Sequence, residues 1–266
     1  AGVHQLWAMD LTSGSISVYA GTSREGIDDG PRLSQATLAQ PSGMTIGGNA
    51  LYWADPESSS VRTIDLAKGQ QVDTLTGTGL FSWGDKDGEG KDAELQHAQG
   101  VAYESGKLYI ADTYNMKVKV LDLATDEVTT IAGSGKRGWK DGPGAQAEFD
   151  EPSGIGAADG KVYVADTDNN LIRVIDAKSG EVTTLTLTNA GAISGSAGVK
   201  ATRISLPPQT VAPGTANLRI SVNAPASYQL NSQAPSQLQL MSANSNVVQL
   251  GESSVHWATD ETSVSL

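Results

Sequence analysis

A stretch of about fifty residues occurs three times in this chain with almost constant internal spacing. Each copy runs from a glycine to an aspartate twelve residues later (43→55, 100→112, 154→166), and a second aspartate follows ten residues after the first. The repeated residues are Gly43, Gly100 and Gly154, then Asp55, Asp112 and Asp166, then Asp65, Asp122 and Asp176. A period of this size, built from short segments, indicates a propeller or a solenoid.

The first copy contains four segments of strand length, at residues 43–46, 51–54, 61–66 and 71–75. In these segments apolar residues alternate with polar ones or form short β-branched runs. Glycine-containing turns at residues 47–49 and 68–69 suit hairpin connections. Four short antiparallel strands per repeat favour a propeller blade over a solenoid coil. We therefore expect an all-β protein with three complete four-stranded blades.

Residues 4–21 resemble the second half of a further copy, because Asp10 precedes Gly21 by the same eleven residues that separate Asp122 from Gly133. Only the third and fourth strands of that copy are present, so the total is about three and a half blades. Closed propellers have about four to eight. We therefore expect residues 1–188 to form an incomplete, N-terminally truncated propeller from a longer protein.

The repeat fades after Thr188, and the tail has a different composition. Residues 189–198 are small and polar, as in a linker. Further on, alternating apolar residues predict half-buried strands near Ile220 and Leu238, and the prolines of residues 207–214 predict a turn-rich edge. We expect residues 199–266 to form a small β-sandwich-like domain. A core of about 70 residues is marginal, which favours its docking on the propeller.

Composition narrows the classes of function. The formal net charge of −12, with scattered Lys and Arg, disfavours binding to a phosphate backbone. The absence of cysteine removes disulfides, thiolate nucleophiles and Cys-type metal sites, and it favours the cytoplasm over the periplasm without deciding the compartment. No apolar run approaches the length of a membrane helix. We expect no nucleic-acid partner and no membrane partner.

The aspartate that closes the second strand of each copy has a structural interpretation. Asp55, Asp112 and Asp166 each precede a turn, where a carboxylate can accept hydrogen bonds from backbone N–H groups one or two residues on. Asn115 and Asn169 tolerate a left-handed conformation in those turns. The alternative, that the carboxylates bind a metal, is disfavoured because one equivalent Asp per copy indicates architecture. We predict that these five residues are turn caps.

The sequence ADTDNNLIRVID, at residues 165–176, resembles the signature of NHL repeats, with Asn169-Asn170-Leu171 in place of Asn-His-Leu. Residues 111–115 are a second good match, whereas the first copy lacks the Asn. Long connections with a repeated Asp-Gly precede each core. They make the chain similar to those NHL proteins in which a thioredoxin-like domain precedes the propeller and a small β-domain follows. The resemblance implies an upstream thioredoxin-like domain that would carry any thiol–disulfide chemistry. It is specific for the fold and not for an activity.

One acidic segment deserves comparison with a calcium loop. Asp85, Asp87, Glu89 and Gly90 match half of an EF-hand loop, but Gln96 stands where a bidentate Glu is required and no flanking helices are expected. Because the Asp-Gly recurs in all three long connections, a turn of the repeat explains most of the match. These three acidic residues are therefore only a weak metal candidate.

The same connections carry large aromatic and basic residues. They are Phe81, Trp83, Lys136, Arg137, Trp139 and Lys140. Equivalent connections of successive blades emerge on one face, so these side chains are expected to lie together and to contact a protein or small ligand. A local positive patch there would attract acidic partners. The alternative is that the rings pack under their own loops.

The sequence offers no catalytic constellation, since His4, His97 and His256 are scattered and no nucleophile elbow is present. We expect a non-catalytic interaction scaffold without a cofactor. The alternative is a metal-dependent propeller enzyme of the lyase or lactonase type. Such a site draws ligands from several first strands, which here read Gly43-Met-Thr-Ile, Gly100-Val-Ala-Tyr and Gly154-Ile-Gly-Ala. RNA binding, a third class, conflicts with the net charge.

Overall fold

A computed structural model describes residues 3–186, 219–221, 236–239, 254–257 and 263–265. Contacts divide the chain into two units, Ala1–Leu185 and Thr186–Leu266. The described part of the second unit is four short strands that pair antiparallel, β17 (Arg219–Ser221) with β20 (Ser263–Ser265) and β18 (Ser236–Gln239) with β19 (Ser254–Trp257). β17 and β18 fall where alternation predicts strands. The predicted linker at 189–198 and the proline-rich edge at 207–214 lie outside the described residues.

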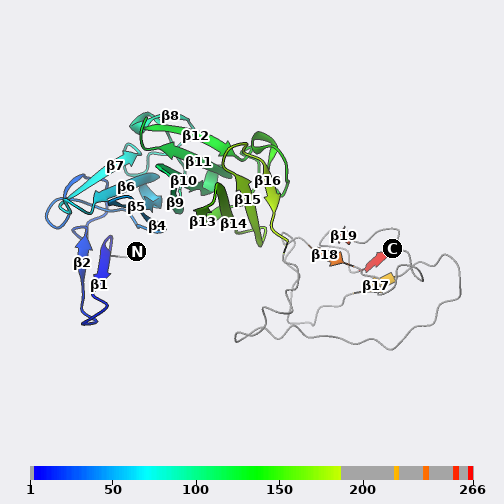
Figure 1. The fold of residues 1–266 in the computed structure, drawn as a ribbon, viewed down its shortest axis with the longest axis horizontal. Helices are drawn as coiled ribbons and strands as arrows, with labels where there is room; N and C mark the ends of the chain where they lie inside the picture. The colour runs from blue at the N-terminus through cyan, green and yellow to red at the C-terminus, as the bar shows by residue number, and fades with distance from the viewer. Residues whose placement is uncertain (1–2, 187–218, 222–235, 240–253, 258–262, 266) are drawn as a thin grey trace, which may run out of the picture. The chain divides into compact units, whose positions relative to one another are not determined.

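The first unit is built from antiparallel sheets that correspond to the sequence copies (Figure 1). An N-terminal hairpin comes first, followed by blade 1, blade 2 and blade 3. The hairpin is β1 (Leu6–Met9) and β2 (Ile16–Ala20). Blade 1 is β4 (Met44–Gly47), β5 (Ala50–Asp55), β6 (Ser60–Asp65) and β7 (Gln71–Thr76). Blade 2 is β9 (Gly100–Glu104), β10 (Lys107–Asp112), β11 (Lys117–Asp122) and β12 (Glu127–Ala132). Blade 3 is β13 (Pro152–Ala158), β14 (Lys161–Asp166), β15 (Leu171–Asp176) and β16 (Val182–Thr184).

The expected all-β, partial propeller fold is confirmed. Each blade is a four-stranded meander in chain order, and the blades follow one another along an arc in Figure 1. The helical content of the described residues is limited to 3₁₀ turns of three residues, η1 (Pro56–Ser58), η2 (Gly90–Asp92), η3 (Thr113–Asn115) and η4 (Gly144–Gln146). None of these helices is long and apolar enough to cross a bilayer.

Each long connection adds a short piece of ladder that the sequence did not predict. The two-residue strands β3 (Gly30–Pro31) and β8 (Gly88–Glu89) pair with the fourth strands of blades 1 and 2, and Gly142 bridges Val182 in blade 3. The repeated Asp-Gly therefore places its carboxylate beside the blade that follows it.

The apolar core lies between successive sheets. One cluster joins the hairpin to blade 1, a second joins blade 1 to blade 2, and a third joins blade 2 to blade 3. Each cluster includes an alanine and a larger apolar residue from the long connection, namely Ala36 and Leu38, Ala93 and Leu95, or Ala147 and Phe149. Burial of these residues ties the connections to the sheets, so the loops rest on a rigid base.

Candidate interaction face

A buried cation occupies the same position in every blade. Arg62, Lys119 and Arg173 follow the repeated Asp by seven residues (55→62, 112→119, 166→173), and all three side chains are fully buried. A buried charge is costly unless it is paired and hydrogen-bonded. Sequence reasoning missed these residues, although a basic residue at a constant place in an apolar strand was an available signal.

Each buried cation is paired with the Asp of the Asp-Gly segment in its long connection. Arg62 lies 3.1 Å from Asp29. Lys119 lies 2.9 Å from Asp87, and Arg173 lies 2.7 Å from Asp141. The same three carboxylates accept hydrogen bonds from hydroxyls of the fourth strands, those of Thr74, Thr130 and Thr184. This set of contacts, which we call the frame, fixes each long connection to its blade.

The repeated aspartates differ from the expected turn caps. Asp55 accepts from the N–H of Ala39, Asp112 from that of Gln96, and Asp166 from that of Asp150, each sixteen residues upstream. All three carboxylates are buried. They therefore bind the long connection, which passes over the end of the second strand, and not the N–H groups of their own turn.

The two asparagines also differ from expectation. The left-handed residue of the turn is the next one along, Met116 with φ 53° and Asn170 with φ 55°. The Asn115 and Asn169 side chains are buried instead, and each donates both to the adjacent Asp carboxylate and to a carbonyl of the long connection, Gly84 or Gly138. The asparagines extend the frame to a second point on the same loop.

Burial raises the pKa of the repeated aspartates. It raises the pKa of Asp55 to about 6 and that of Asp112 to about 7, and it also raises the pKa of Asp166. The guanidinium of Arg173 lies 2.8 Å from Asp166. Lys119 pairs with Asp85 and Asp87, and no ion pair between it and Asp112 occurs in the described blades. In the middle blade the carboxylate is therefore held by hydrogen bonds, and the charge of Lys119 acts on it from beyond ion-pair distance.

The predicted aromatic residues lie at the surface. Phe81 is 67% exposed, Trp83 is 64% exposed and Trp139 is 38% exposed, and the indole N–H of Trp139 donates to the Thr184 hydroxyl at 3.3 Å. Phe81 and Trp83 therefore do not pack under their own loop, whereas Trp139 is partly held by blade 3. Lys136 and Lys140 are exposed beside it.

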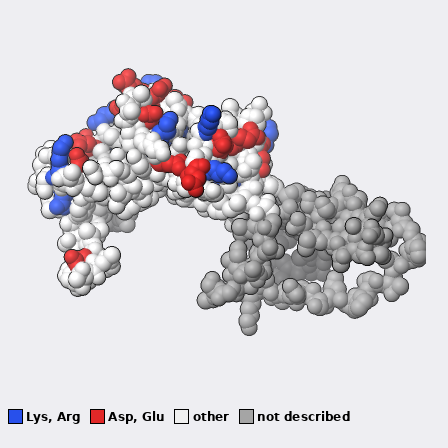
Figure 2. All heavy atoms as spheres, viewed as in Figure 1, with Lys and Arg blue, Asp and Glu red and all other residues white. Residues whose placement is uncertain are grey.

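The predicted positive patch is interrupted at Arg137, although Lys136 and Lys140 are exposed. Arg137 pairs with Asp150 and Glu151, each at 2.8 Å, and lies 3.7 Å from Asp168. On the face shown in Figure 2, Lys and Arg side chains are interleaved with Asp and Glu over blades 2 and 3, with no continuous basic surface. Counting of charges along the loop could not reveal this, because the acidic partners come from other segments of the blade.

Two groups of carboxylates are candidates for binding a metal ion. Among the described residues, Asp150, Glu151 and Asp168 place carboxylate oxygens within 4.8 Å of one another, and the Arg137 guanidinium is paired with all three. In the weak sequence candidate, Asp85 faces Lys117 and Lys119, and Asp87 faces Lys119. Lysine and arginine already supply the positive charge at both places.

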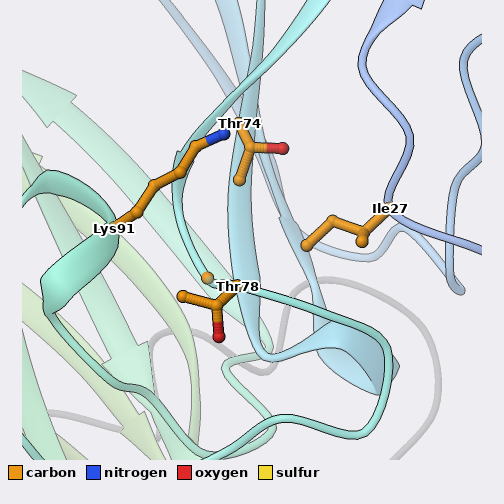
Figure 3. A pocket seen from close by; sticks show the side chains of 5 residues that line it. Ile27, Thr74, Thr78 and Lys91 are labelled. Carbon is orange, nitrogen blue, oxygen red and sulfur yellow. The ribbon is translucent and has the colours of Figure 1, made fainter.

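An open hollow of about 220 Å³ lies beside β7, lined by Ile27, Thr74, Gly77, Thr78 and Lys91 (Figure 3). The Lys91 ammonium lies 3.4 Å from Asp29, whose other oxygen accepts the Thr74 hydroxyl at 2.6 Å. The polar groups of the hollow thus belong to the frame of blade 1.

Known proteins share this sequence pattern. A family model described as NHL repeat matches residues 149–175. "Protein SUPPRESSOR OF QUENCHING 1, chloroplastic" from Arabidopsis thaliana is 40% identical over 190 residues, which are 68% of this chain and 18% of that protein. NHL repeat-containing protein 2 from Homo sapiens is 36% identical over 209 residues, 70% of this chain and 29% of that protein. This chain belongs to the NHL-repeat propeller family. It spans less than a third of either relative.

A crystal structure of a protein of unknown function from Bacteroides thetaiotaomicron shares the fold of the NHL blades. Its TM-score is 0.53 at 18% identity, with 65% of this chain and 42% of that chain covered. At this identity the likeness concerns the fold alone.

The three NHL blades carry different residue types at three loop positions. These positions are structurally equivalent because the frame fixes each loop to its blade in the same way. In each long connection the N–H of a glycine donates to the backbone carbonyl of the buried Leu or Phe, and this shared hydrogen bond shows which loop residues are equivalent. The pairs are Gly26 with Leu38, Gly84 with Leu95, and Gly138 with Phe149. We call three positions of each blade the loop triplet. They are the residue before that glycine, the second residue after the buried Leu or Phe, and the second residue after the repeated Asp. The triplets are Glu25, Gln40 and Glu57 in blade 1, Trp83, His97 and Tyr114 in blade 2, and Arg137, Glu151 and Asp168 in blade 3.

Proposed function

We propose that this chain is a non-catalytic interaction module whose loop face binds a protein partner. The observation that carries the proposal is the exposure of Phe81 and Trp83, 67% and 64%, on a connection that is fixed to its blade by ion pairs to the buried Lys119. Large rings held on a rigid base contribute contact area at low entropic cost, and loops on a stable scaffold commonly carry binding residues. The propeller supplies the base and the loops supply the contacts.

The alternative of a metal-dependent propeller enzyme gains no support from the first strands. Across β4, β9 and β13 there is one carboxylate, Glu104, and it accepts the N–H of Gly160. A catalytic metal needs about three protein ligands around an open position. The residues of these strands do not supply that set, so we favour the interaction module.

A redox role belongs to the proposal only through the longer protein. The chain contains no cysteine, so thiol–disulfide exchange cannot occur on it. The resemblance to proteins with an upstream thioredoxin-like domain suggests that such a domain performs the chemistry. In that arrangement the propeller would bring the domain to its substrate protein.

The proposal is tested by the double variant Trp83→Ala/Trp139→Ala. Proteins retained from an extract of the source cells by the wild-type chain are identified, purified and titrated against both forms. The variant is expected to bind the retained partner at least about tenfold more weakly, since aromatic anchors often carry 2 kcal/mol or more. Trp7→Ala is the matched control, because Trp7 is 55% exposed on the N-terminal hairpin. Equal binding by the double variant and the wild type would contradict the proposal.

A further inference from the structure

The loop triplet of blade 2 is aromatic where those of its neighbours are charged. His97 and Tyr114 stack with their ring centroids 4.5 Å apart and their planes 8° from parallel, and Tyr114 is 45% exposed. In blade 3 the same three positions bring Arg137, Glu151 and Asp168 into one ionic cluster. Trp83 stands where blade 3 has Arg137, whose guanidinium contacts both other members of its triplet, so the indole is expected to lie next to the stacked pair.

The three triplets form a continuous row. The N–H of His97 donates to the hydroxyl of Ser59, two residues beyond Glu57 of the blade 1 triplet. The N–H of Glu151 donates to the sulfur of Met116, two residues beyond Tyr114 of the blade 2 triplet. The aromatic triplet therefore lies between the triplets of blades 1 and 3.

The charges around the aromatic triplet are mainly negative. The blade 1 triplet adds two carboxylates, and the blade 3 cluster of Asp150, Glu151 and Asp168 surrounds one guanidinium. The connection at residues 78–98 has five carboxylates against two lysines, and two of the five, Asp85 and Asp87, are paired with Lys117 and Lys119 of blade 2. Exposed lysines such as Lys86 and Lys136 are present but outnumbered. An exposed aromatic surface within an acidic border complements a cation, which gains from the ring faces and from the carboxylates together.

We propose that the aromatic triplet of blade 2 binds a basic segment of a partner protein. A lysine or arginine side chain lies over the rings of Trp83 and Tyr114, and basic residues on either side of it face the acidic triplets of blades 1 and 3. This inference rests on the proposed function and replaces the acidic partner that the sequence suggested. The physical reason for the change is the pairing of Arg137, the central cation of the predicted patch, with Asp150, Glu151 and Asp168.

The test uses the full 266-residue chain and two labelled peptides of twelve residues, one alternating Arg and Ser and the other alternating Glu and Ser. Binding is measured by fluorescence anisotropy at low and at physiological salt. The arginine peptide is expected to bind at least about tenfold more tightly than the glutamate peptide, and more weakly as salt rises.

The decisive variant exchanges the blade 2 triplet for that of blade 3, Trp83→Arg/His97→Glu/Tyr114→Asp. The exchange keeps residue types that the structure accommodates at the equivalent positions, and it makes the chain more acidic. Simple charge attraction would therefore preserve binding, whereas recognition by the rings predicts a loss of about tenfold. Trp7→Ser is the matched control, and an unchanged thermal melt shows that the variant is folded.

Two results would overturn the inference. One is equal binding of the arginine and glutamate peptides to the wild-type chain. The other is undiminished binding of the arginine peptide to the folded triplet exchange. Neither result touches the proposed function, which depends on whether the retained partner protein loses affinity for the Trp83→Ala/Trp139→Ala variant.

Discussion

The guanidinium of Arg173 lies 2.8 Å from the carboxylate of Asp166, and neither side chain is exposed to solvent. The same guanidinium donates to the backbone carbonyls of Glu148 and Lys140 and to Asp141 in the long connection. One side chain thus ties the second strand, the third strand and the loop of blade 3 together. The loop triplet can vary because this contact set does not use it.

Removal of the buried cation is expected to unfold or strongly destabilise blade 3. Arg173→Met leaves Asp166 as a buried carboxylate without its ion pair, which costs about 3–5 kcal/mol in comparable cases. Arg173→Lys should cost less, since blade 2 has lysine at this position. Urea unfolding measures both, with the exposed Arg24→Met as control. Equal stability of Arg173→Met and the wild type would show that the pair contributes nothing net.

The constant spacings were sufficient to predict the blades, since the strands of all three copies occur close to the expected residues. They were also sufficient to place Phe81 and Trp83 on a loop. The partners of Asp55, Asp112 and Asp166 could not be predicted, because they depend on where a long connection returns across the blade sixteen residues away. Arg62 and its counterparts were read as ordinary strand residues, because a charge is seldom buried and only the packed sheet shows which face is covered.

The buried Asp112 is expected to make stability depend on pH. Burial raises the pKa of Asp112 from 3.8 to about 7 in the folded state. The stability contributed by its protonated carboxyl is therefore fully present below about pH 4 and is lost as the pH rises through 7. Each pH unit in that window corresponds to as much as about 1.4 kcal/mol. Asp112→Asn should remove this part of the pH dependence.

The comparison of Asp112→Asn with the wild type isolates this residue from the other titrating groups. Urea unfolding at several values from pH 4 to pH 8 gives the difference in the free energy of unfolding between the two proteins. That difference should shift steadily in favour of the variant as the pH rises. A constant difference across the range would mean that Asp112 keeps an ordinary pKa in the folded protein.

The repeated aspartates are expected to act without a metal. Asp112→Ala leaves the N–H of Gln96 and the side chain of Asn115 without their acceptor, which should cost about 1–3 kcal/mol. Asp166→Ala also breaks the buried ion pair with Arg173 and should cost about 3–5 kcal/mol. Addition of EDTA or of calcium should leave the melting temperature of the wild-type chain unchanged. Should EDTA reproduce the destabilisation seen in the two variants, these carboxylates are metal ligands.

The repeated glycine at the start of each copy has a packing explanation that yields a matched pair of variants. A Cβ on Gly43 would lie 2.7 Å from the carbonyl oxygen of Gln99 and 2.8 Å from the Cα of Gly100. A Cβ on Gly100 would meet the carbonyl oxygen of Ser153 in the next blade, whereas one on Gly154 would contact only the Cβ of Ala165, at 3.5 Å. The first two glycines allow the first strands of neighbouring blades to approach closely.

Gly100→Ala is therefore expected to destabilise the protein by about 1–3 kcal/mol, because backbone atoms of β13 must move to admit a methyl group. Gly154→Ala should change stability by less than about 0.5 kcal/mol, since the space beside it is sufficient. Urea unfolding of the two variants provides the comparison, and the identical chemistry of the substitution removes differences in the unfolded chain. If both cost the same, the close approach of neighbouring blades does not explain the glycine, and a local requirement within each strand does.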